Sequence, residues 1–351
     1  MNSPYLQSYF AYLHMLRYPR GDLTQLSTVG LVEGRNIEIK TDDGILLKGY
    51  HIMPPGPISQ YAITLNDNQK NDYYNEKLAS SERIVIYFHG NGGSRALNFR
   101  INKIKALASQ LSAHVITIDY RGFADSNGQP SEDGTHLDSI AVLKWINNII
   151  LENNVYGYMI QPIGINDNSN ECKGSRSPPY LYIYGHSLGT AIGTHLAVTM
   201  TKIAPSSLTG LILDAPFTTL TEAACSHPIS LIFRLIPGST NLIKRYLHYK
   251  YPTIERIGSI DTNLLLLHGI NDWKIPVDHS RLLYKTAVSS QYSIRDKQKN
   301  HIRIKEIVGA DHNDVYKSAD WLQELPQFIK TVETDKDSKL SKRCYNPLTS
   351  T

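Results

Sequence analysis

The feature of this 351-residue sequence that most restricts its fold is a series of short apolar runs alternating with helical patterns. Two of the runs, Arg83–Phe88 and His114–Tyr120, are almost entirely β-branched and aromatic, which is typical of strands buried on both faces. Further runs are Asn36–Lys40, Ile45–Met53, Tyr180–Tyr184, Gly210–Leu213, Leu264–Leu267 and His301–Val308. Amphipathic segments lie near 94–111, 134–151, 188–203, 278–287 and 316–332. The alternation predicts one α/β domain over 36–332, with a doubly wound, mostly parallel sheet and helices on both faces.

Several stretches depart from this alternation. Residues 1–35 form an N-terminal segment in which Tyr5–Tyr18 carries apolar side chains at helical spacing. Such a stripe is expected either to dock on the body of the protein or to rest on a bilayer surface. The other exceptions are a polar stretch at 56–82, a predicted surface insertion at 157–179, an apolar helical segment at 217–260 and a polar tail at 333–351 that we expect to be disordered.

The composition and the apolar runs of the sequence argue against several classes of protein. A formal net charge of +4 is too small to indicate a nucleic-acid binder, and three scattered cysteines predict neither a disulfide framework nor a zinc knuckle. No stretch approaches the roughly 20 apolar residues of a membrane-spanning helix, and no secretory signal pattern or Asn-x-Ser/Thr site is present.

The pentapeptide Gly185–Gly189 has the pattern Gly-x-Ser-x-Gly and follows a buried-strand pattern directly. A helical stretch rich in small residues comes next, which completes the strand–turn–helix context of a nucleophile elbow. In such an elbow a sharp turn exposes the serine oxygen, and the helix behind it directs amide groups toward developing negative charge. We therefore expect Ser187 to be a catalytic nucleophile rather than part of a structural turn.

A nucleophilic serine needs a base and an orienting carboxylate, which follow it in the chain order serine, acid, histidine. Asp272 follows the run Leu264–Leu267, and His312 follows the last predicted strand. Both are expected in loops at the carboxyl edge of the sheet, where ligand sites of open α/β sheets gather. The competing acids are Asp214, Asp311 and Asp314, and the competing histidines are His279 and His301.

The tetrahedral intermediate of an acyl transfer requires two backbone donors for its oxyanion. The first is the Leu188 amide, directly after the nucleophile. The second is expected from the glycine-rich loop after Arg83–Phe88, with Asn91 as the first choice and Gly92 as the alternative. This loop lacks the spacing of a phosphate-binding loop, and no clustered metal-ligand pattern exists, so we predict neither a metal nor another cofactor.

Four motifs together resemble the serine α/β-hydrolases: GHSLG at 185–189, HGNGG at 89–93, the stretch 119–134 and HGINDWKIP at 268–276. In detail the chain is similar to the lysophosphatidylserine and monoacylglycerol lipases among the abhydrolase-domain-containing proteins. The likeness runs from about residue 36 to 332 and includes Ala215–Thr218, Ser226–Pro228 and Phe233–Gly238. It implies an α/β-hydrolase fold with an eight-stranded, mostly parallel sheet and a small helical cap at about 217–260.

The resemblance also implies an activity, a substrate class and a location. By it, Ser187, Asp272 and His312 are nucleophile, acid and base in the hydrolysis of lysophosphatidylserine, other lysophospholipids or monoacylglycerol. We expect the acyl chain near Ile229, Ile232, Phe233 and Ile236, and an anionic head group near Arg95. Family members are typically anchored in the endoplasmic reticulum membrane by an N-terminal helix, which this sequence does not display. A cytoplasmic or peripheral membrane location is therefore the alternative, and no oligomeric state is predicted.

Two other classes of function stay open: a different hydrolase and a non-catalytic protein of the same fold. A thioesterase or serine peptidase uses the same three side chains, so only substrate profiling separates these enzymes from a lipase. A non-catalytic binding protein of this fold would normally lack one of the three, and all three are present here.

Overall fold

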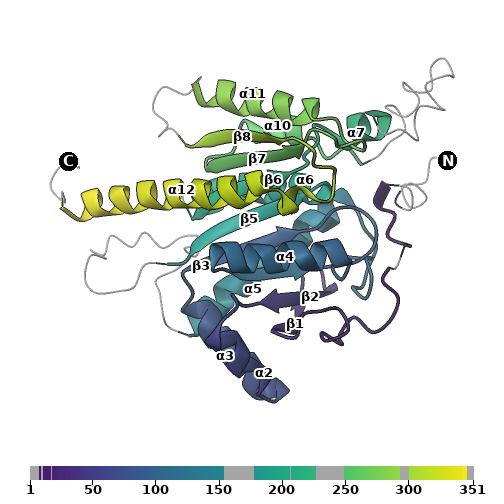
Figure 1. Ribbon diagram of the computed structural model, residues 1–351, viewed down its shortest axis with the longest axis vertical. Helices are drawn as coiled ribbons and strands as arrows, with labels where there is room; N and C mark the ends of the chain where they lie inside the picture. The colour runs from purple at the N-terminus through teal and green to yellow at the C-terminus, as the bar shows by residue number, and fades with distance from the viewer. Residues whose placement is uncertain are drawn as a thin grey trace.

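The computed structural model describes residues 8, 11–16, 18–153, 178–205, 207–226, 249–292 and 300–345. One eight-stranded sheet organises these residues, with the spatial order β1-β2-β4-β3-β5-β6-β7-β8 (Figure 1). The strands are β1 (Gly34–Lys40), β2 (Leu46–Ile52), β3 (Arg83–Phe88), β4 (His114–Ile118), β5 (Tyr180–His186), β6 (Leu208–Asp214), β7 (Asn263–Gly269) and β8 (Ile302–Ile307). β2 runs antiparallel to β1 and β4, and all neighbours from β4 to β8 are parallel. The predicted mostly parallel sheet is confirmed.

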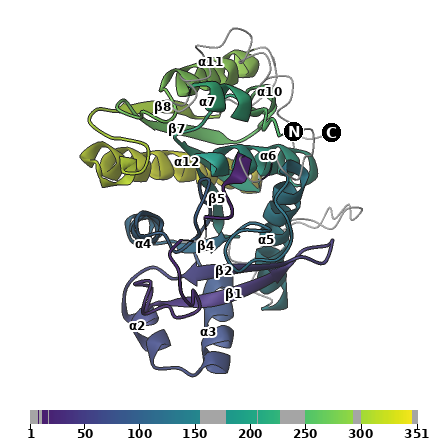
Figure 2. The same cartoon turned by 90° about the vertical axis from the view of Figure 1, so that its right-hand side faces the viewer.

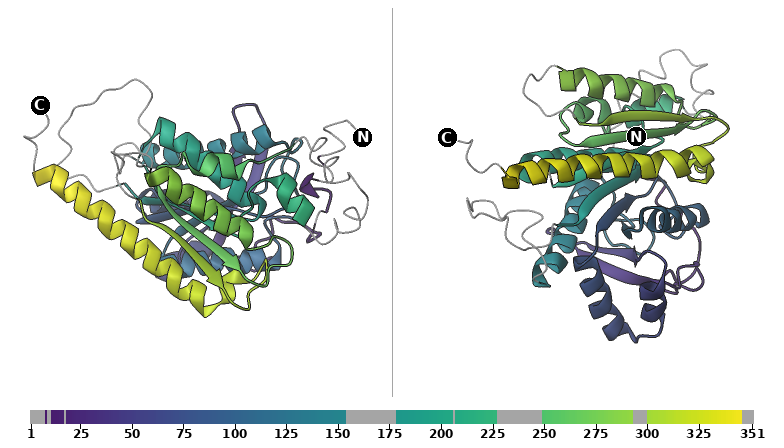
Figure 3. Two further views of the ribbon diagram at one scale, coloured as in Figure 1. Left: turned by 90° about the horizontal axis from the view of Figure 1, so that it is seen from above. Right: turned by 60° about the vertical axis from the view of Figure 1, so that its left-hand side comes forward.

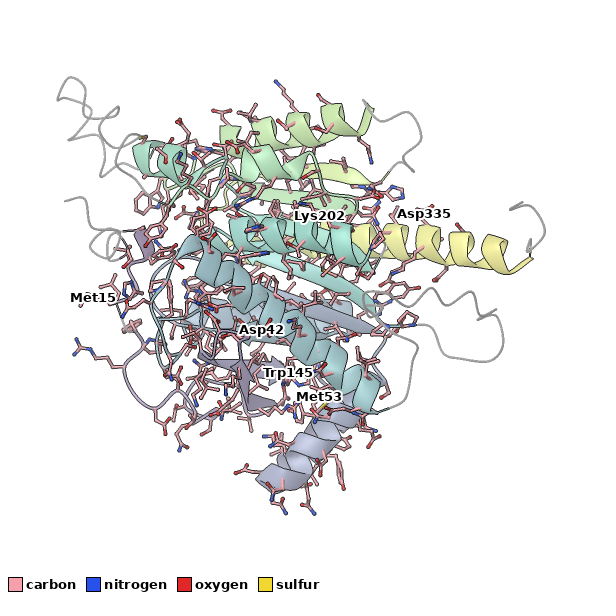
Figure 4. The ribbon with its side chains drawn as sticks, turned by 180° about the vertical axis from the view of Figure 1, so that it is seen from behind. Met15, Asp42, Met53, Trp145, Lys202 and Asp335 are labelled. Carbon is pink, nitrogen blue, oxygen red and sulfur yellow. The ribbon has the colours of Figure 1, made fainter. Side chains whose placement is uncertain are left out.

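Helices cover both faces of the sheet. α4 (Asn98–Leu111) and α12 (Ala319–Tyr345) lie on the face nearer the viewer in Figure 1, and α5 (Glu132–Glu152) and α6 (Leu188–Ile203) lie on the face seen in Figure 4. Shorter or peripheral helices are α2 (Pro57–Ile63), α3 (Asp67–Ala79), α7 (Leu220–Ser226), α10 (Thr253–Ile257), α11 (Asp278–Tyr292) and the 3-10 turn η2 (Val315–Lys317).

The alternation of side chains along a strand explains why the sheet needs helices on both faces. In β3, Ile84, Ile86 and Phe88 enter one apolar core together with residues of α5 and α6. Val85 and Tyr87 point the opposite way and enter a second core with residues of α4 and α12. All five side chains are buried, as the continuous apolar run predicts.

The polar stretch 56–82 folds into two helices, which the apolar pattern did not predict. α2 and α3 project beyond the β1–β2 edge of the sheet (Figure 2). The side chain of Asn66 caps α3 by accepting a hydrogen bond from the Gln69 amide. Tyr74, Leu78 and Ala79 are the buried residues of α3, so this helix presents too few apolar positions for a clear sequence pattern.

The expectation of a disordered tail from residue 333 is wrong as far as Tyr345, because α12 continues to that residue. Figure 3 shows this helix extending past the body of the protein. Glu333 anchors the extension by accepting hydrogen bonds from the Arg83 guanidinium at 2.7 and 2.8 Å. Lys336 adds a hydrogen bond of 3.1 Å to Thr209 Oγ1. These partners lie far away in sequence, so the pattern of the tail alone does not reveal them.

The N-terminal segment docks on the body near the carboxyl ends of the strands. Tyr12 is fully buried, its hydroxyl lies 2.9 Å from that of Tyr251, and its ring packs edge-on against Phe123 and Tyr249. The following Leu13 has a positive φ of 49° and ends the helical backbone found at Ala11–Tyr12. In the part of the chain that the structure describes, no helix combines the length and apolar character needed to cross a membrane.

Candidate active site

The candidate site lies along the row of carboxyl ends of the parallel strands. The pairing register sets Phe88 of β3 beside Gly185 of β5, and Gly269 of β7 beside Ile307 of β8. The loops that leave these strands therefore emerge at one edge of the sheet. Ser187 directly follows β5, and the loops after β7 and β8 contain Asp272 and His312.

Ser187 sits on a strained turn between β5 and α6. Its backbone has φ 53° and ψ −117°, a conformation that costs a non-glycine residue about 1–3 kcal/mol. Its amide donates to Asp214 O at 2.9 Å, and its carbonyl accepts from the amide and hydroxyl of Thr190. A Cβ at Gly185 or Gly189 would collide with backbone atoms, of Gly189 and Phe88 respectively. Both glycines are thus required by the close approach of the strand and helix around this turn.

The structure brings Ser187, His312 and Asp272 into one chain of hydrogen bonds. Ser187 Oγ lies 3.1 Å from His312 Nε2, and His312 Nδ1 lies 2.7 Å from Asp272 Oδ2. All three residues are at most 8% exposed. With a proton on Nδ1 that donates to the carboxylate, Nε2 of the imidazole is free to accept the serine proton.

Asp272 is held in its ionised form by the groups around it. Burial alone would raise the pKa of this carboxyl, but hydrogen bonds from His268, His312 and the Ile275 amide reverse that effect and leave the pKa well below its usual range. Oδ1 accepts from the amides of Lys274 and Ile275 at 2.9 Å each, and Oδ2 lies 3.3 Å from His268 Nε2.

His186, the residue before Ser187, contacts the main chain of His312. Its Nε2 lies 2.9 Å from the carbonyl oxygen of His312. Burial, followed by the nearby positive charge of Lys103, lowers the pKa of His186 well below its usual value, so the ring is neutral. Sequence reasoning missed the supporting roles of His186 and His268. The signal available was position, because one lies inside Gly-x-Ser-x-Gly and the other stands four residues before Asp272.

The loop after β3 lies directly against Ser187. A Cβ built on Gly90 would be 3.1 Å from Ser187 Cβ. The N-terminal segment is hydrogen-bonded to this loop. Ala11 O accepts from Asn91 Nδ2 at 2.7 Å, and Tyr12 O accepts from the Gly92 amide at 3.2 Å. The Gly92 amide also donates to Asn91 Oδ1. Of the two candidate oxyanion amides in this loop, that of Gly92 is therefore already engaged.

Comparison with known proteins places this arrangement in a family. Residues 85–322, which span β3 to α12 and contain all three residues of the hydrogen-bonded chain, match the sequence profile of the alpha/beta hydrolase family. The chain belongs to the alpha/beta hydrolase family.

Among proteins of known name, this hydrolase is similar to lysophosphatidylserine lipase ABHD12. The identity is 30% over 338 residues of the Xenopus tropicalis protein, covering 94% of this chain and 78% of that protein. The Mus musculus protein is 30% identical over 339 residues, covering 95% and 76% respectively. Protein ABHD12B of Homo sapiens is 28% identical over 303 residues, covering 84% and 72%.

Solved structures share the hydrolase fold at lower sequence identity. An alpha-beta hydrolase from Vibrio vulnificus is 16% identical with a TM-score of 0.59, covering 94% of this chain and 92% of that one. The Pyrococcus furiosus esterase Pf2001 is 17% identical with a TM-score of 0.58, covering 90% and 97%. The resemblance inferred from the sequence motifs and the predicted fold are both confirmed.

The side chains of the competing acids and histidines have other partners in the structure. Asp214 is turned toward Lys103 Nζ at 2.5 Å and the Tyr184 hydroxyl at 2.9 Å. His279 contacts Thr218, and His301 lies 3.8 Å from Asp335. The side chains of Asp311 and Asp314 accept hydrogen bonds from main-chain amides of the loop that carries His312, so these two residues stabilise the conformation of that loop.

The structure contradicts the expectation that Arg95 offers a free cation to a substrate head group. Its side chain is 1% exposed and paired with both Asp119 and Asp125, with Arg95 Nη1 lying 2.5 Å from Asp125 Oδ1. The guanidinium also lies 4.4 Å from the centre of the Tyr50 ring. An arginine so enclosed stabilises the loop after β3 and has no surface to present to a ligand.

Other predicted substrate contacts fall outside the described residues: Ile229, Ile232, Phe233 and Ile236, with much of the predicted cap at 217–260. Within the described ranges, α7 and α10 flank that gap. No group of three or more His, Cys, Asp or Glu side chains is arranged to hold a metal ion, as far as the described residues extend.

Proposed function

We propose that this protein is a serine hydrolase that cleaves acyl esters of lipids, with Ser187 as nucleophile, His312 as base and Asp272 as orienting acid. The observation that carries the proposal is the buried chain of hydrogen bonds from Ser187 Oγ through His312 to Asp272. The similarity to lysophosphatidylserine lipases over 94% of the chain supports the same reaction class.

In the acylation half, His312 Nε2 takes the hydroxyl proton while Ser187 Oγ attacks the ester carbonyl carbon. The carbonyl oxygen becomes an oxyanion that accepts hydrogen bonds from the Leu188 and Asn91 amides. Leu188 is the first residue of α6, so its amide has no acceptor within the helix. The ester bond to the leaving alcohol then breaks, and that alcohol takes the proton from His312.

In the deacylation half, a water molecule attacks the acyl-serine carbonyl and gives a proton to His312 Nε2. The bond between the acyl carbon and Ser187 Oγ breaks, the fatty acid leaves, and Ser187 recovers its proton from His312. Asp272 remains ionised throughout and stabilises the imidazolium that forms in each half, consistent with the low pKa of its carboxyl.

The substrates we propose are lysophosphatidylserine, other lysophospholipids and monoacylglycerol, which all release a long acyl chain from a polar alcohol. We infer further that such substrates are drawn from a lipid surface. Four exposed apolar residues support this inference, in the same segment that pins the oxyanion loop: Leu13, Met15, Leu16 and Tyr18. Figure 4 labels Met15 at the end of the molecule opposite Asp335. If Leu16→Glu sediments with phospholipid vesicles as well as the unaltered protein does, this segment is not the contact.

The decisive experiment compares Ser187→Ala with the exposed-site control Ser259→Ala. We expect Ser187→Ala to lower fatty-acid release from monoacylglycerol and lysophosphatidylserine by at least about 10³-fold and to abolish labelling by a fluorophosphonate. Ser259→Ala should match the unaltered protein, since Ser259 lies exposed on a turn. Retention of hydrolysis by Ser187→Ala would disprove the nucleophile. Cleavage of acyl thioesters or peptides in preference to lipid esters would replace the substrate class but keep the mechanism.

A further inference from the structure

A second buried arginine, Arg100, donates hydrogen bonds to the loop after β3, which contains the proposed oxyanion donor Asn91. It lies in the first turn of α4 and is 2% exposed. Its Nη2 donates to Gly90 O at 2.7 Å and to Asn91 O at 3.1 Å, and its Nη1 donates to Ser94 O at 2.9 Å. Within the described ranges, the hydrogen bonds of this guanidinium all end on main-chain carbonyls of one loop.

The bond to Gly90 O fixes the direction of a catalytically relevant amide. The carbonyl of Gly90 and the N–H of Asn91 belong to one planar peptide group, in which they point in opposite directions. A donor that holds the carbonyl on one side therefore aims the Asn91 N–H toward the other. His89 Nδ1 also lies 2.7 Å from Gly90 O, so this oxygen is held from two sides.

The charge of Arg100 adds an electronic effect to this geometric one. A hydrogen bond from a guanidinium to a carbonyl oxygen is stronger than a neutral one, and it polarises the peptide group. Electron density drawn toward Gly90 O leaves the Asn91 N–H a better donor. In a buried site, where the effective dielectric constant is low, this polarisation is not screened by water.

Arg95, in this loop, and Arg100, in α4, have different kinds of hydrogen-bond partner. Arg95 is paired with the carboxylates of Asp119 and Asp125 and thus has the partners of a structural arginine. The bonds of Arg100 go to peptide carbonyls instead, although burying a charge is costly. Burial lowers the pKa of Arg100, with the nearby Tyr87 and Asp119 opposing that effect.

We propose that Arg100 is a positioning residue of the oxyanion hole, which aims and polarises the Gly90–Asn91 peptide toward the carbonyl oxygen of the substrate. The inference rests on the proposed function, since it takes the Asn91 amide as an oxyanion donor. Arg100 does not itself touch the substrate in this arrangement. Its effect is on the transition state, where the oxyanion carries full charge, and not on substrate binding.

The test uses Arg100→Met, which removes the charge and all three hydrogen bonds, and Arg100→Lys, which keeps the charge but replaces the planar guanidinium by a single ammonium donor group. Each variant is assayed on p-nitrophenyl butyrate, with active sites counted by fluorophosphonate labelling, and with an alkyl trifluoromethyl ketone that forms an oxyanion when Ser187 adds to it. Loss of a complete oxyanion donor typically lowers kcat by about 10²- to 10³-fold. For Arg100→Met we expect kcat per active site to fall about 10- to 100-fold, KM to change less than threefold, and ketone affinity to fall in parallel with kcat. Arg100→Lys should lie between Arg100→Met and the unaltered protein.

The control variant is Arg83→Met, which removes a half-buried arginine bound to Glu333 at the amino end of β3, away from the loop that follows this strand. It should lower thermal stability without changing kcat or ketone affinity per active site. If Arg100→Met behaves in the same way, the role of Arg100 is structural and the inference is overturned. Should Arg100→Met fail to fold, Arg100→Lys decides by the same measurements, and values within twofold of the unaltered protein overturn the inference. If the unaltered protein itself shows no Ser187-dependent hydrolysis, the proposed function fails rather than this refinement of it.

Discussion

The contacts of Asp272 predict the outcome of the substitution Asp272→Asn in detail. One carboxylate oxygen accepts two main-chain amides, from Lys274 and Ile275, and the other lies 2.7 Å from His312 Nδ1 and 3.3 Å from His268 Nε2. An asparagine in this place must put its oxygen against the two amides, because the opposite orientation sets its NH₂ group against two N–H donors. Its NH₂ group therefore faces His312.

This orientation forces the wrong tautomer on the imidazole. With an NH₂ donor beside it, Nδ1 of His312 must accept, and the ring proton moves to Nε2, which faces Ser187 Oγ at 3.1 Å. A protonated Nε2 cannot take the serine proton. Turning the amide over to recover the productive tautomer leaves two amide donors unpaired, at about 1–3 kcal/mol each. A total of about 2–6 kcal/mol corresponds to a fall in kcat of about 30-fold to 10⁴-fold. Loss of the carboxylate charge moves the expected value toward about 10⁴-fold, as seen for the same change in other Ser-His-Asp hydrolases.

The assay is hydrolysis of p-nitrophenyl butyrate at pH 8, normalised to folded protein by circular dichroism and thermal unfolding. The matched control is Asp278→Asn, at a carboxylate whose side chain is 79% exposed and bound to Arg281 on the surface of α11. It should retain full activity. A folded Asp272→Asn protein with kcat within tenfold of the unaltered enzyme would refute both the tautomer argument and the assignment of this acid.

Two further predictions concern buried groups outside the hydrogen-bonded chain. Asp214→Asn leaves Lys103 buried without its counter-charge, so we expect the free energy of unfolding to fall by about 3–5 kcal/mol. The kcat of the folded fraction should fall less than tenfold. A fall in kcat as large as that of Asp272→Asn would make Asp214 the acid. The buried pair His51 and His114 predicts a loss of stability in acid: burial, and then the charge of Arg35, lower the pKa of His114 to about 3, and the pKa of His51 is also well below its usual value. Between pH 6.5 and about 3 the unfolded chain binds a proton at His114 that the folded protein does not, so stability falls as the pH falls, by about 2 kcal/mol at pH 5 for His114, and His51 acts in the same direction. Urea unfolding at pH 8 and pH 5 measures this difference, and equal unfolding free energies at the two values would contradict it.

The central strands and the strand–turn–helix around Ser187 could be predicted from the sequence, because the local apolar pattern there matches the burial of each residue in the fold. A strand buried on both faces must be continuously apolar, and β3 and β7 are. The loop that carries Asp272 was predictable for the same reason, since it follows β7. The loop that carries His312 follows β8, whose residues alternate between apolar and charged, and it ends at the same side of the sheet because β8 is parallel to β7.

The features that the sequence did not reveal depend on contacts between residues that are distant in sequence. α3 is held partly by Arg35, whose Nη1 donates to Asn71 O at 2.9 Å and whose Nη2 donates to Asn75 Oδ1 at 2.7 Å. The extension of α12 depends in the same way on Arg83, 250 residues before Glu333. Arg95 and Arg100 stand five residues apart, and nothing in their local sequence says that one meets carboxylates and the other meets carbonyls. These pairings exist only after the sheet has assembled.

The distribution of the site along the chain has a consequence for biosynthesis. During translation the elbow that holds Ser187 leaves the ribosome well before Asp272 and His312, which belong to about the last quarter of the sequence. Under the proposed mechanism, a nascent chain that lacks β7 and β8 carries Ser187 without its base, so the serine has the ordinary reactivity of a hydroxyl. By the same mechanism, we expect the chain to be inactive until its last two strands have joined the sheet, so that it hydrolyses lipid esters only after its fold is complete.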